Sequence, residues 1–229
     1  MMQNKCRNIY INLFTEKNMK TSELTSILAA IIILTAIFGF SYAIKTQWET
    51  ISAILLFSII IILVSVFSKK LIAYMLDSNV EHEIWKVYRY GYKPGWHFNK
   101  PISAGIIFPL FFTLFTWGIL KFSAILTYET RALKARASKR FGFYSFAEMT
   151  DWHNGIIGAS GIIAALLVAV IAYFTNLELL AKMTVFYAFW NLIPVSNLDG
   201  TQIFFGSRIL YAILAITTII FTFYALFIV

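Results

Sequence analysis

The chain has little of what builds a disulfide scaffold, a cysteine metal site or a soluble domain. Cys6 is the only cysteine among 229 residues, which excludes an internal disulfide framework and a multi-cysteine metal site. No glycine-rich phosphate loop of the P-loop or dinucleotide type is present. Charged residues make up only 13% of the chain and hydrophobic residues 59%, a balance well outside the range of soluble domains.

What the chain has instead is a set of long apolar blocks, which predict membrane-spanning helices because of their length. The last block is uncharged to the C-terminus and long enough to cross a bilayer. We therefore expect an all-α polytopic protein of the cell membrane with five or six transmembrane helices. The prediction comprises a cytoplasmic N-terminal segment, 1–25, and one multi-span membrane domain, 26–229, with blocks at 27–44, 51–67, 102–120, 156–174, 179–193 and 209–229.

The basic residues concentrate in two segments between blocks, 68–101 and 127–154, and the formal net charge is +8. Positive loops beside membrane helices face the cytoplasm and anionic lipid headgroups, so the expected partner is the lipid bilayer and not nucleic acid. Six crossings would put the two segments on opposite sides. A re-entrant element at 102–120, interrupted by Gly105 and Pro109, would put them on one side. Both topologies remain open at this stage.

Small residues recur every four positions in the block 156–174, at Gly161, Ala165 and Ala169. In a membrane, such spacing lets two helix backbones approach closely. We interpret this face as a helix-packing surface. A passage for substrate along the same face is the alternative.

The most informative stretch is NLIPVSNLDG, Asn191–Gly200, at the end of the fifth block. It places a carboxylate, Asp199, between the helix-breaking Pro194 and the turn-forming Gly200. A charged group at membrane depth costs about 2.5–3.5 kcal/mol on insertion scales, and therefore normally has a partner or a function. A plain loop at a helix end is the simpler interpretation, since these residue types are common in turns.

This stretch resembles the N-x-x-P-x-x-x-L-D-G motif of the site-2 proteases, which are intramembrane zinc metalloproteases. The segment that begins at Asn154 is similar in layout to the helix of that family that carries Gly-Pro-x-x-Asn, but GASGIIA lacks both the proline and the asparagine. The resemblance implies a site-2 protease-like core with Asp199 at the position of the third zinc ligand. It also suggests that Asn191, Pro194 and Gly200 bind a substrate or partner segment.

The sequence departs from that family where the catalytic motif should be. The other two ligands of the family are the histidines of H-E-x-x-H, whose glutamate activates the metal-bound water. The matching stretch, Ser65–Lys70, reads SVFSKK, and Lys69 stands where a ligand histidine is expected. His82 and Glu83 begin such a motif, but Lys86 follows instead of the second histidine. Asp199 is then a vestigial ligand position, and we expect no zinc cofactor and no catalytic residues.

Three functions follow from these observations. The favoured one is a catalytically inactive site-2 protease homologue that binds transmembrane segments of partner proteins. The second is an active intramembrane zinc metalloprotease with non-standard ligands. The third is a transporter-like or structural membrane protein in which Asp199 pairs with Arg208 or Lys182.

Overall fold

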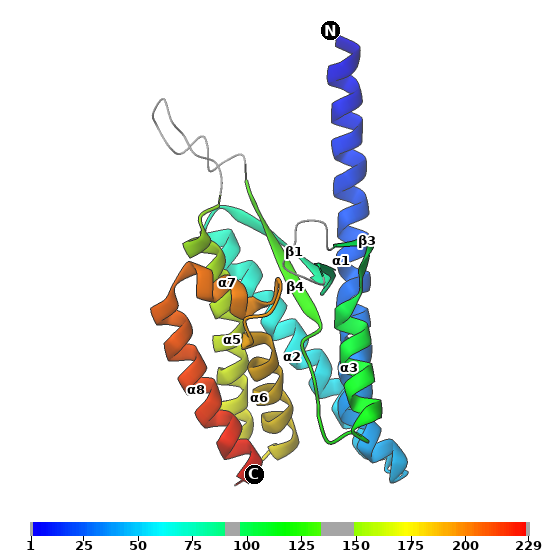
Figure 1. Cartoon of the computed structure of the whole chain (residues 1–229), viewed down its shortest axis with the longest axis vertical. Helices are drawn as coiled ribbons and strands as arrows, with labels where there is room; N and C mark the ends of the chain where they lie inside the picture. Colours follow the sequence, from blue (N-terminus) through cyan, green and yellow to red (C-terminus); the bar gives the residue numbers. More distant parts are fainter. Residues whose placement is uncertain (1, 90–96, 134–148, 228–229) are drawn as a thin grey trace.

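The structure is a computed structural model that describes the backbone of residues 2–89, 97–133 and 149–227, and side chains from Ser22 onward within these ranges, except at positions 89 and 97. The described part is mostly helical, with four short strands (Figure 1). In chain order the elements are α1 (Met2–Ile44), α2 (Trp48–Met75), β1 (Ser78–Ile84), β2 (Val87–Arg89), β3 (His97–Ile102), α3 (Ala104–Phe115), β4 (Leu126–Ala132), α5 (Asp151–Phe174), α6 (Glu178–Leu192), α7 (Asp199–Gly206) and α8 (Arg208–Phe227).

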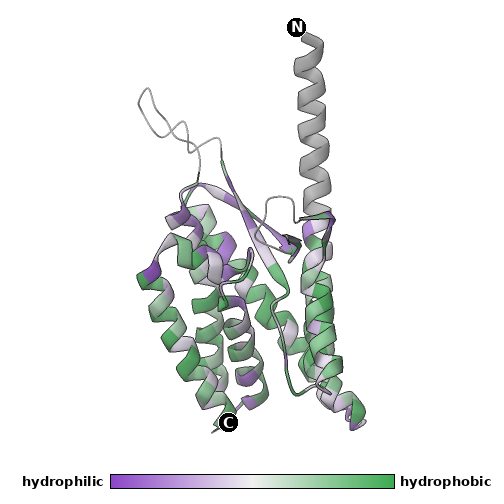
Figure 2. Cartoon of the chain, viewed as in Figure 1, coloured by the Kyte–Doolittle hydropathy of each residue, from purple (hydrophilic) through white to green (hydrophobic). Residues whose placement is uncertain are grey.

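Four of the helices in the described part are long and apolar enough to cross a membrane, which supports the prediction of a membrane protein. They are Ser22–Ile44 within α1, together with α2, α5 and α8. Figure 2 shows hydrophobic residues along these helices, while hydrophilic residues gather around the strands and α7. The number of crossings stays a prediction.

Two predicted blocks differ from the helices that form. The helix predicted over 51–67 continues through Lys69 and Lys70 to Met75. The block 102–120 forms only the 12-residue helix α3, about 18 Å long at 1.5 Å per residue, too short to cross a hydrocarbon core of about 30 Å. Figure 1 shows that α3 runs beside α1 away from the strands, and that the chain then returns toward them to begin β4.

The two basic segments contain β-strands, which the all-α prediction did not include. β1 pairs with β4 and β2 pairs with β3, both antiparallel. Along β1 the side chains of Ser78, Val80 and His82 are buried, while their neighbours are more exposed. This alternation with a period of two is typical of a strand with one covered face. Because the segment is polar, no apolar block marks it in the sequence.

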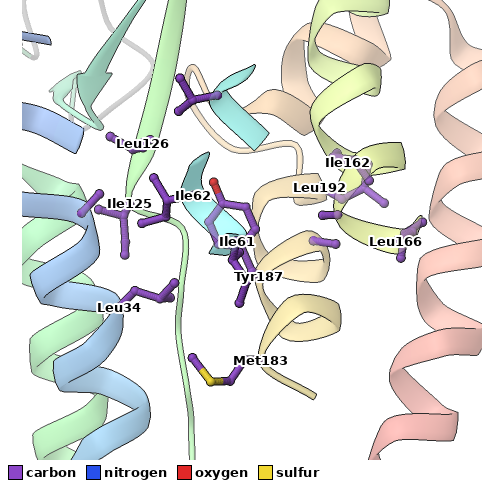
Figure 3. Close-up of a cluster of buried hydrophobic side chains, with 14 of the residues drawn as sticks. Leu34, Ile61, Ile62, Ile125, Leu126, Ile162, Leu166, Met183, Tyr187 and Leu192 are labelled. Atoms are coloured by element: carbon purple, nitrogen blue, oxygen red, sulfur yellow. The ribbon is translucent and has the colours of Figure 1, made fainter. Parts of the chain in front are cut away.

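Helix α5 packs against α2, α6 and α7, and α1 packs against α2. Gly161, Ala165 and Ala169 are all buried, which agrees with their predicted role in close helix packing. Figure 3 shows the largest buried hydrophobic cluster, with side chains from α1, α2, the start of β4, α5 and α6. This core lies just below the strands and holds α2 and α6 in fixed positions beneath them.

Candidate functional site

Asp199 lies at the first position of α7, where the chain folds back over the end of α6. Pro194 ends α6, because the residue before a proline is restricted to extended conformations and Ile193 is extended, with φ −63° and ψ 128°. Gly200 allows the chain to fold back close to the end of α6. A Cβ at this position would lie 1.9 Å from the backbone oxygen of Leu192, so only glycine lets α7 begin this close to α6.

The carboxylate of Asp199 forms an ion pair with Lys69 from the distal part of α2. Lys69 Nζ lies 2.5 Å from Asp199 Oδ2, and both side chains are only 2% exposed. The two residues are 130 positions apart in the sequence. A charge-assisted hydrogen bond in such a shielded place is strong, and each charge would be very costly to bury alone. The pair therefore ties α2 to α7.

The lysine side chain is enclosed by groups from α5 and β4. A Cβ on Gly161 would lie 2.4 Å from Lys69 Cε, so the glycine on α5 provides the space that the lysine fills. The ammonium also lies 4.9 Å from the centre of the Tyr128 ring, within the range of a cation–π contact. The Tyr128 hydroxyl donates to the backbone oxygen of Asn154 at 2.7 Å. Burial, followed by the charge of Asp199, raises the pKa of Tyr128 well above its ordinary value.

A second polar group lies beside the ion pair, on the neighbouring strand. His82 on β1 is directly opposite Tyr128 on β4, and its side chain is 1% exposed. His82 Nδ1 lies 3.1 Å from Glu23 Oε1, and Lys70 Nζ lies 2.8 Å from the same oxygen. Burial lowers the pKa of His82, although the hydrogen bond with Glu23 opposes this. The charges of Lys69 and Asp199 also act on this imidazole, so the two polar groups form one cluster.

The structure places the predicted binding residues in two different environments. Asn191 is 1% exposed, and its amide nitrogen donates to the backbone oxygen of Tyr187 at 2.8 Å. Gly200 is also buried, whereas Pro194 is exposed in the segment between α6 and α7. Asn191 Oδ1 and Asp199 Oδ1 are buried without a hydrogen-bond partner among the described residues. Asn191 and Gly200 thus shape the interior of the site, and Pro194 lies at its surface.

The described residues around Asp199 do not form a set that fits a zinc ion. A catalytic zinc site needs three protein ligands, and in the described ranges no three His, Cys, Asp or Glu side chains lie close enough to hold a metal. Asp199 is the expected third ligand, but its carboxylate is bound to the Lys69 ammonium. The predicted pairing of Asp199 with Arg208 or Lys182 is wrong for the same reason, and the Arg208 guanidinium instead lies 5.9 Å from the Phe204 ring.

A polar cleft of about 650 Å³ runs along β4 next to this cluster. Its lining comes from β4, the first turns of α5 and the segment around α7: Thr127, Tyr128, Glu129, Thr130, Asp151, Asn154, Ser196, Asn197, Thr201, Gln202 and Phe205. Among the described strands β4 pairs only with β1. The cleft therefore lies along a strand edge that no described strand covers.

The direction of the backbone groups on β4 follows from its pairing. Trp85 N–H donates to the Ile125 oxygen, and Leu133 N–H donates to the Asp77 oxygen. The backbone N–H and C=O groups of the odd-numbered residues in this stretch therefore point toward β1. In an antiparallel ladder the backbone groups of the residues between them point away from the partner strand, and these residues are Leu126, Tyr128, Thr130 and Ala132. Gln202 Nε2 donates to the Tyr128 oxygen at 3.1 Å, which covers one of these outward groups.

In the sequence the NLDG motif marks Asp199, but no motif marks its partner or the groups around the pair. Lys69 stands out only because it replaces a histidine of H-E-x-x-H. The signal that could have found the pairing is the presence of two opposite charges beside apolar blocks, because charges at membrane depth are normally paired. Tyr128 and His82 carry no such signal, and the charge of Glu23 does not point to His82, since the proximity of these groups depends on the strand register and on the position of α1.

Comparisons of the chain with protein-family models, with curated proteins and with solved structures found no match. The relationship to the site-2 proteases therefore rests on the resemblance of the motif around Asp199 and on the layout of the helices, and it stays a prediction.

Proposed function

We propose that this protein is a catalytically inactive, site-2 protease-like protein of the cell membrane that binds membrane-proximal segments of other membrane proteins. The observation that carries the proposal is the buried ion pair between Lys69 and Asp199. In this pair the Lys69 ammonium is bound to the carboxylate that an active relative would use to bind its metal.

The chemistry of an ammonium explains why the pair argues against proteolysis. A catalytic zinc ion keeps an open coordination position, in which a bound water loses a proton near neutral pH. An ammonium group offers three hydrogen-bond donors and no coordination position. Lys69 can therefore neutralise Asp199 and hold α7 in place, but it cannot generate a hydroxide nucleophile.

The cleft along β4 supports the binding part of the proposal. Exposed strand edges bind extended peptides by adding a strand, with main-chain hydrogen bonds providing affinity. The outward backbone groups of Thr130 and Ala132 have no partner among the described residues. A segment that leaves the membrane beside the strands could pair with this edge, while its transmembrane helix lies against the protein in the bilayer.

The topology that suits this role has five crossings, with α3 and the segment after it dipping into the membrane and returning. The strands and both basic segments then lie on the cytoplasmic side, as the positive-inside rule favours. A binding cleft at that level would receive partner segments as they emerge from the bilayer into the cytoplasm.

The experiment measures metal content and peptide capture on the same full-length protein, purified into nanodiscs. We expect less than stoichiometric zinc by mass spectrometry and specific capture of a peptide that has one transmembrane helix followed by an extended tail. Thr130→Pro removes an outward N–H of β4 and keeps the ladder to β1, so capture should be lost. Thr130→Val is the matched control, because it removes the hydroxyl that contacts Asn154 but keeps the N–H.

Two results would contradict the proposal. Stoichiometric zinc that disappears in Asp199→Ala would show a metalloenzyme. Equal capture by wild-type protein, Thr130→Pro and Thr130→Val would show that the edge of β4 is not the binding surface.

A further inference from the structure

We infer that a small aromatic pocket near the β4 cleft holds a tryptophan or tyrosine side chain of the partner, at the point where the partner's transmembrane helix ends. This inference rests on the proposed function, since it names the residue that anchors the bound segment. The place, the size and the lining of the pocket carry it.

The pocket has a volume of about 230 Å³ and an apolar lining. Its walls come from the connection between β1 and β2, from α3 and the chain after it, from the end of α6 and from the segment before α7: Trp85, Phe108, Phe112, Phe122, Trp190, Ile193, Val195 and Leu198. None of these lining residues carries a charge, and most are aromatic. The pocket therefore differs in chemistry from the polar cleft along β4.

Phe122 lies at the centre of the aromatic cluster. Its ring centre is 4.5 Å from that of Trp190 and 5.5 Å from that of Phe112, and both pairs are tilted. The Trp85 ring is stacked on the other side, at 6.4 Å. Aromatic rings favour tilted and offset arrangements at such separations. A ring that enters the pocket extends this cluster and gains the same contacts, which an aliphatic chain does not.

The pocket lies at the junction between the strands and the membrane helices. Trp85 follows β1 directly, and its backbone N–H donates to the Ile125 oxygen while its own oxygen accepts from Gly105 N–H, both at 2.9 Å. A Cβ on Gly105 would lie 2.3 Å from the same Ile125 oxygen, so only glycine lets α3 begin this close to β4. In the proposed topology this junction is the cytoplasmic boundary of the bilayer.

The chemistry of the occupant follows from this depth and from the size of the pocket. Tryptophan and tyrosine concentrate at the ends of transmembrane helices, at the level of the lipid headgroups. A partner helix beside the protein presents these side chains at the height of the pocket. The volume of about 230 Å³ is below the usual range of roughly 300–1,000 Å³ for small-molecule sites, which suits one large side chain.

The pocket and the polar cleft border the same segment between α6 and α7. Val195 and Leu198 line the pocket. Ser196 and Asn197, which lie between them in the sequence, line the cleft along β4. On the other side, Phe122 belongs to the chain that leads into β4. One partner segment can therefore place a ring in the pocket and continue along the edge of β4.

Packing of α3 against the strands is the simpler explanation for aromatic rings at this junction. It accounts for Trp85, which is only 2% exposed. Close-packed interiors leave few unfilled spaces, however, and packing alone gives no reason for rings from several elements to surround a pocket. A ring supplied by a partner fills that space.

The experiment uses three synthetic peptides that share one transmembrane helix and one extended tail. They differ only in the last residue of the helix, which is tryptophan, leucine or alanine. Dissociation constants are measured with the full-length protein in nanodiscs of one lipid composition, so that the partition of each peptide into the bilayer is the same for every protein variant.

Two variants change the pocket in opposite ways. Phe112→Ala removes a lining ring, and Val195→Trp fills the pocket with a ring from the protein's own chain. Val195 is 46% exposed, so the larger side chain does not disrupt a buried core. Phe115→Ala is the matched control, because Phe115 lies on the same helix and stacks on Phe111 but does not line the pocket.

We expect the wild-type protein to bind the tryptophan peptide about tenfold more tightly than the alanine peptide, with the leucine peptide between them. Phe112→Ala and Val195→Trp should reduce this ratio to about twofold or less, and Phe115→Ala should leave it unchanged. Each ratio compares two peptides on one protein, so a general loss of folded protein does not alter it.

The outcomes separate this inference from the proposed function. If the leucine peptide binds as tightly as the tryptophan peptide, the pocket does not select aromatic side chains and the inference is overturned. If the preference for tryptophan persists in both Phe112→Ala and Val195→Trp, the ring binds elsewhere and the inference is also overturned. In both cases loss of capture in Thr130→Pro leaves the proposed function intact. If no peptide binds to the wild-type protein, the proposed function fails, and the inference fails with it.

Discussion

Two ion pairs in this protein have the same chemistry and similar lengths but very different surroundings. Lys69 Nζ and Asp199 Oδ2 are 2.5 Å apart, and both side chains are 2% exposed. Lys86 Nζ and Glu83 Oε2 are 2.7 Å apart, and the side chains are 37% and 40% exposed. Water can replace the partner of either charge in the second pair but not in the first. The comparison teaches that burial, and not distance, decides what depends on a pair.

The two pairs also differ in what they connect. Lys86 and Glu83 are three residues apart, so their pair fixes only the connection from β1 to β2. Lys69 and Asp199 join the distal part of α2 to the start of α7. Loss of the buried pair should therefore disturb the whole region between the membrane helices and the strands.

The largest effect is expected when one member of the buried pair is removed. Lys69→Met should destabilise the protein by about 3–5 kcal/mol, because Asp199 is left as an uncompensated buried charge. Thermal unfolding in a mild detergent, followed by circular dichroism, measures this loss as a lower midpoint.

A double substitution sharpens this comparison between the pairs. Lys69→Met with Asp199→Leu removes both charges, and replacing a buried pair with apolar residues is often neutral or stabilising. We expect the double variant to regain most of the stability that Lys69→Met loses. If the single variants are as stable as the wild-type protein, the two charges are not confined in a dry interior, and the contrast with Lys86 and Glu83 is wrong.

The sequence was sufficient to predict the long helices, because an apolar block of sufficient length has few alternatives to a membrane span. It was not sufficient to predict how far α2 extends. The prediction ended the helix near Phe67, since Lys69 and Lys70 look like the start of a loop. In the structure Lys69 lies inside the helix, and its charge is paired with Asp199, a residue that no local pattern links to it.

The candidate site was predictable only in part for a related reason. The turn chemistry of Pro194 and Gly200 marked the end of α6 and drew attention to Asp199. The groups that surround the pair come from β1, β4 and α1, and a strand of seven residues in a polar segment gives a weaker signal than an apolar block. Tertiary contacts between distant elements, such as that of His82 with Glu23, cannot be read from spacing.

An intermediate effect is expected from His82, which is buried beside the ion pair but is held neutral by its surroundings. Burial lowers its pKa in the folded state from the ordinary value of 6.5. The unfolded chain therefore takes up a proton first as the pH falls. Protonation of His82 therefore leaves the free energy of unfolding at its full value above about pH 6.5 and lowers it as the pH falls toward the lower folded pKa of the imidazole.

Substitution of the histidine tests this. Unfolding midpoints between pH 7.5 and about 5 should fall less steeply for His82→Gln than for the wild-type protein. His153→Gln is the matched control, since His153 lies in the first turns of α5 and is only partly buried. Equal slopes for all three proteins would mean that His82 titrates as freely as an exposed histidine.

The smallest effect is expected at the exposed pair, and it completes the comparison. Glu83 raises the pKa of Lys86 through their hydrogen bond, which shows that the charges interact, but an exposed pair contributes only about 0.2–1 kcal/mol. Glu83→Gln and Lys86→Gln should each shift the unfolding midpoint slightly, and added salt should reduce even that shift because it screens exposed charges. The loss in Lys69→Met should be nearly independent of salt. A salt-independent loss of several kcal/mol in Lys86→Gln would mean that proximity alone sets the strength of both pairs, and the distinction drawn from burial would fail.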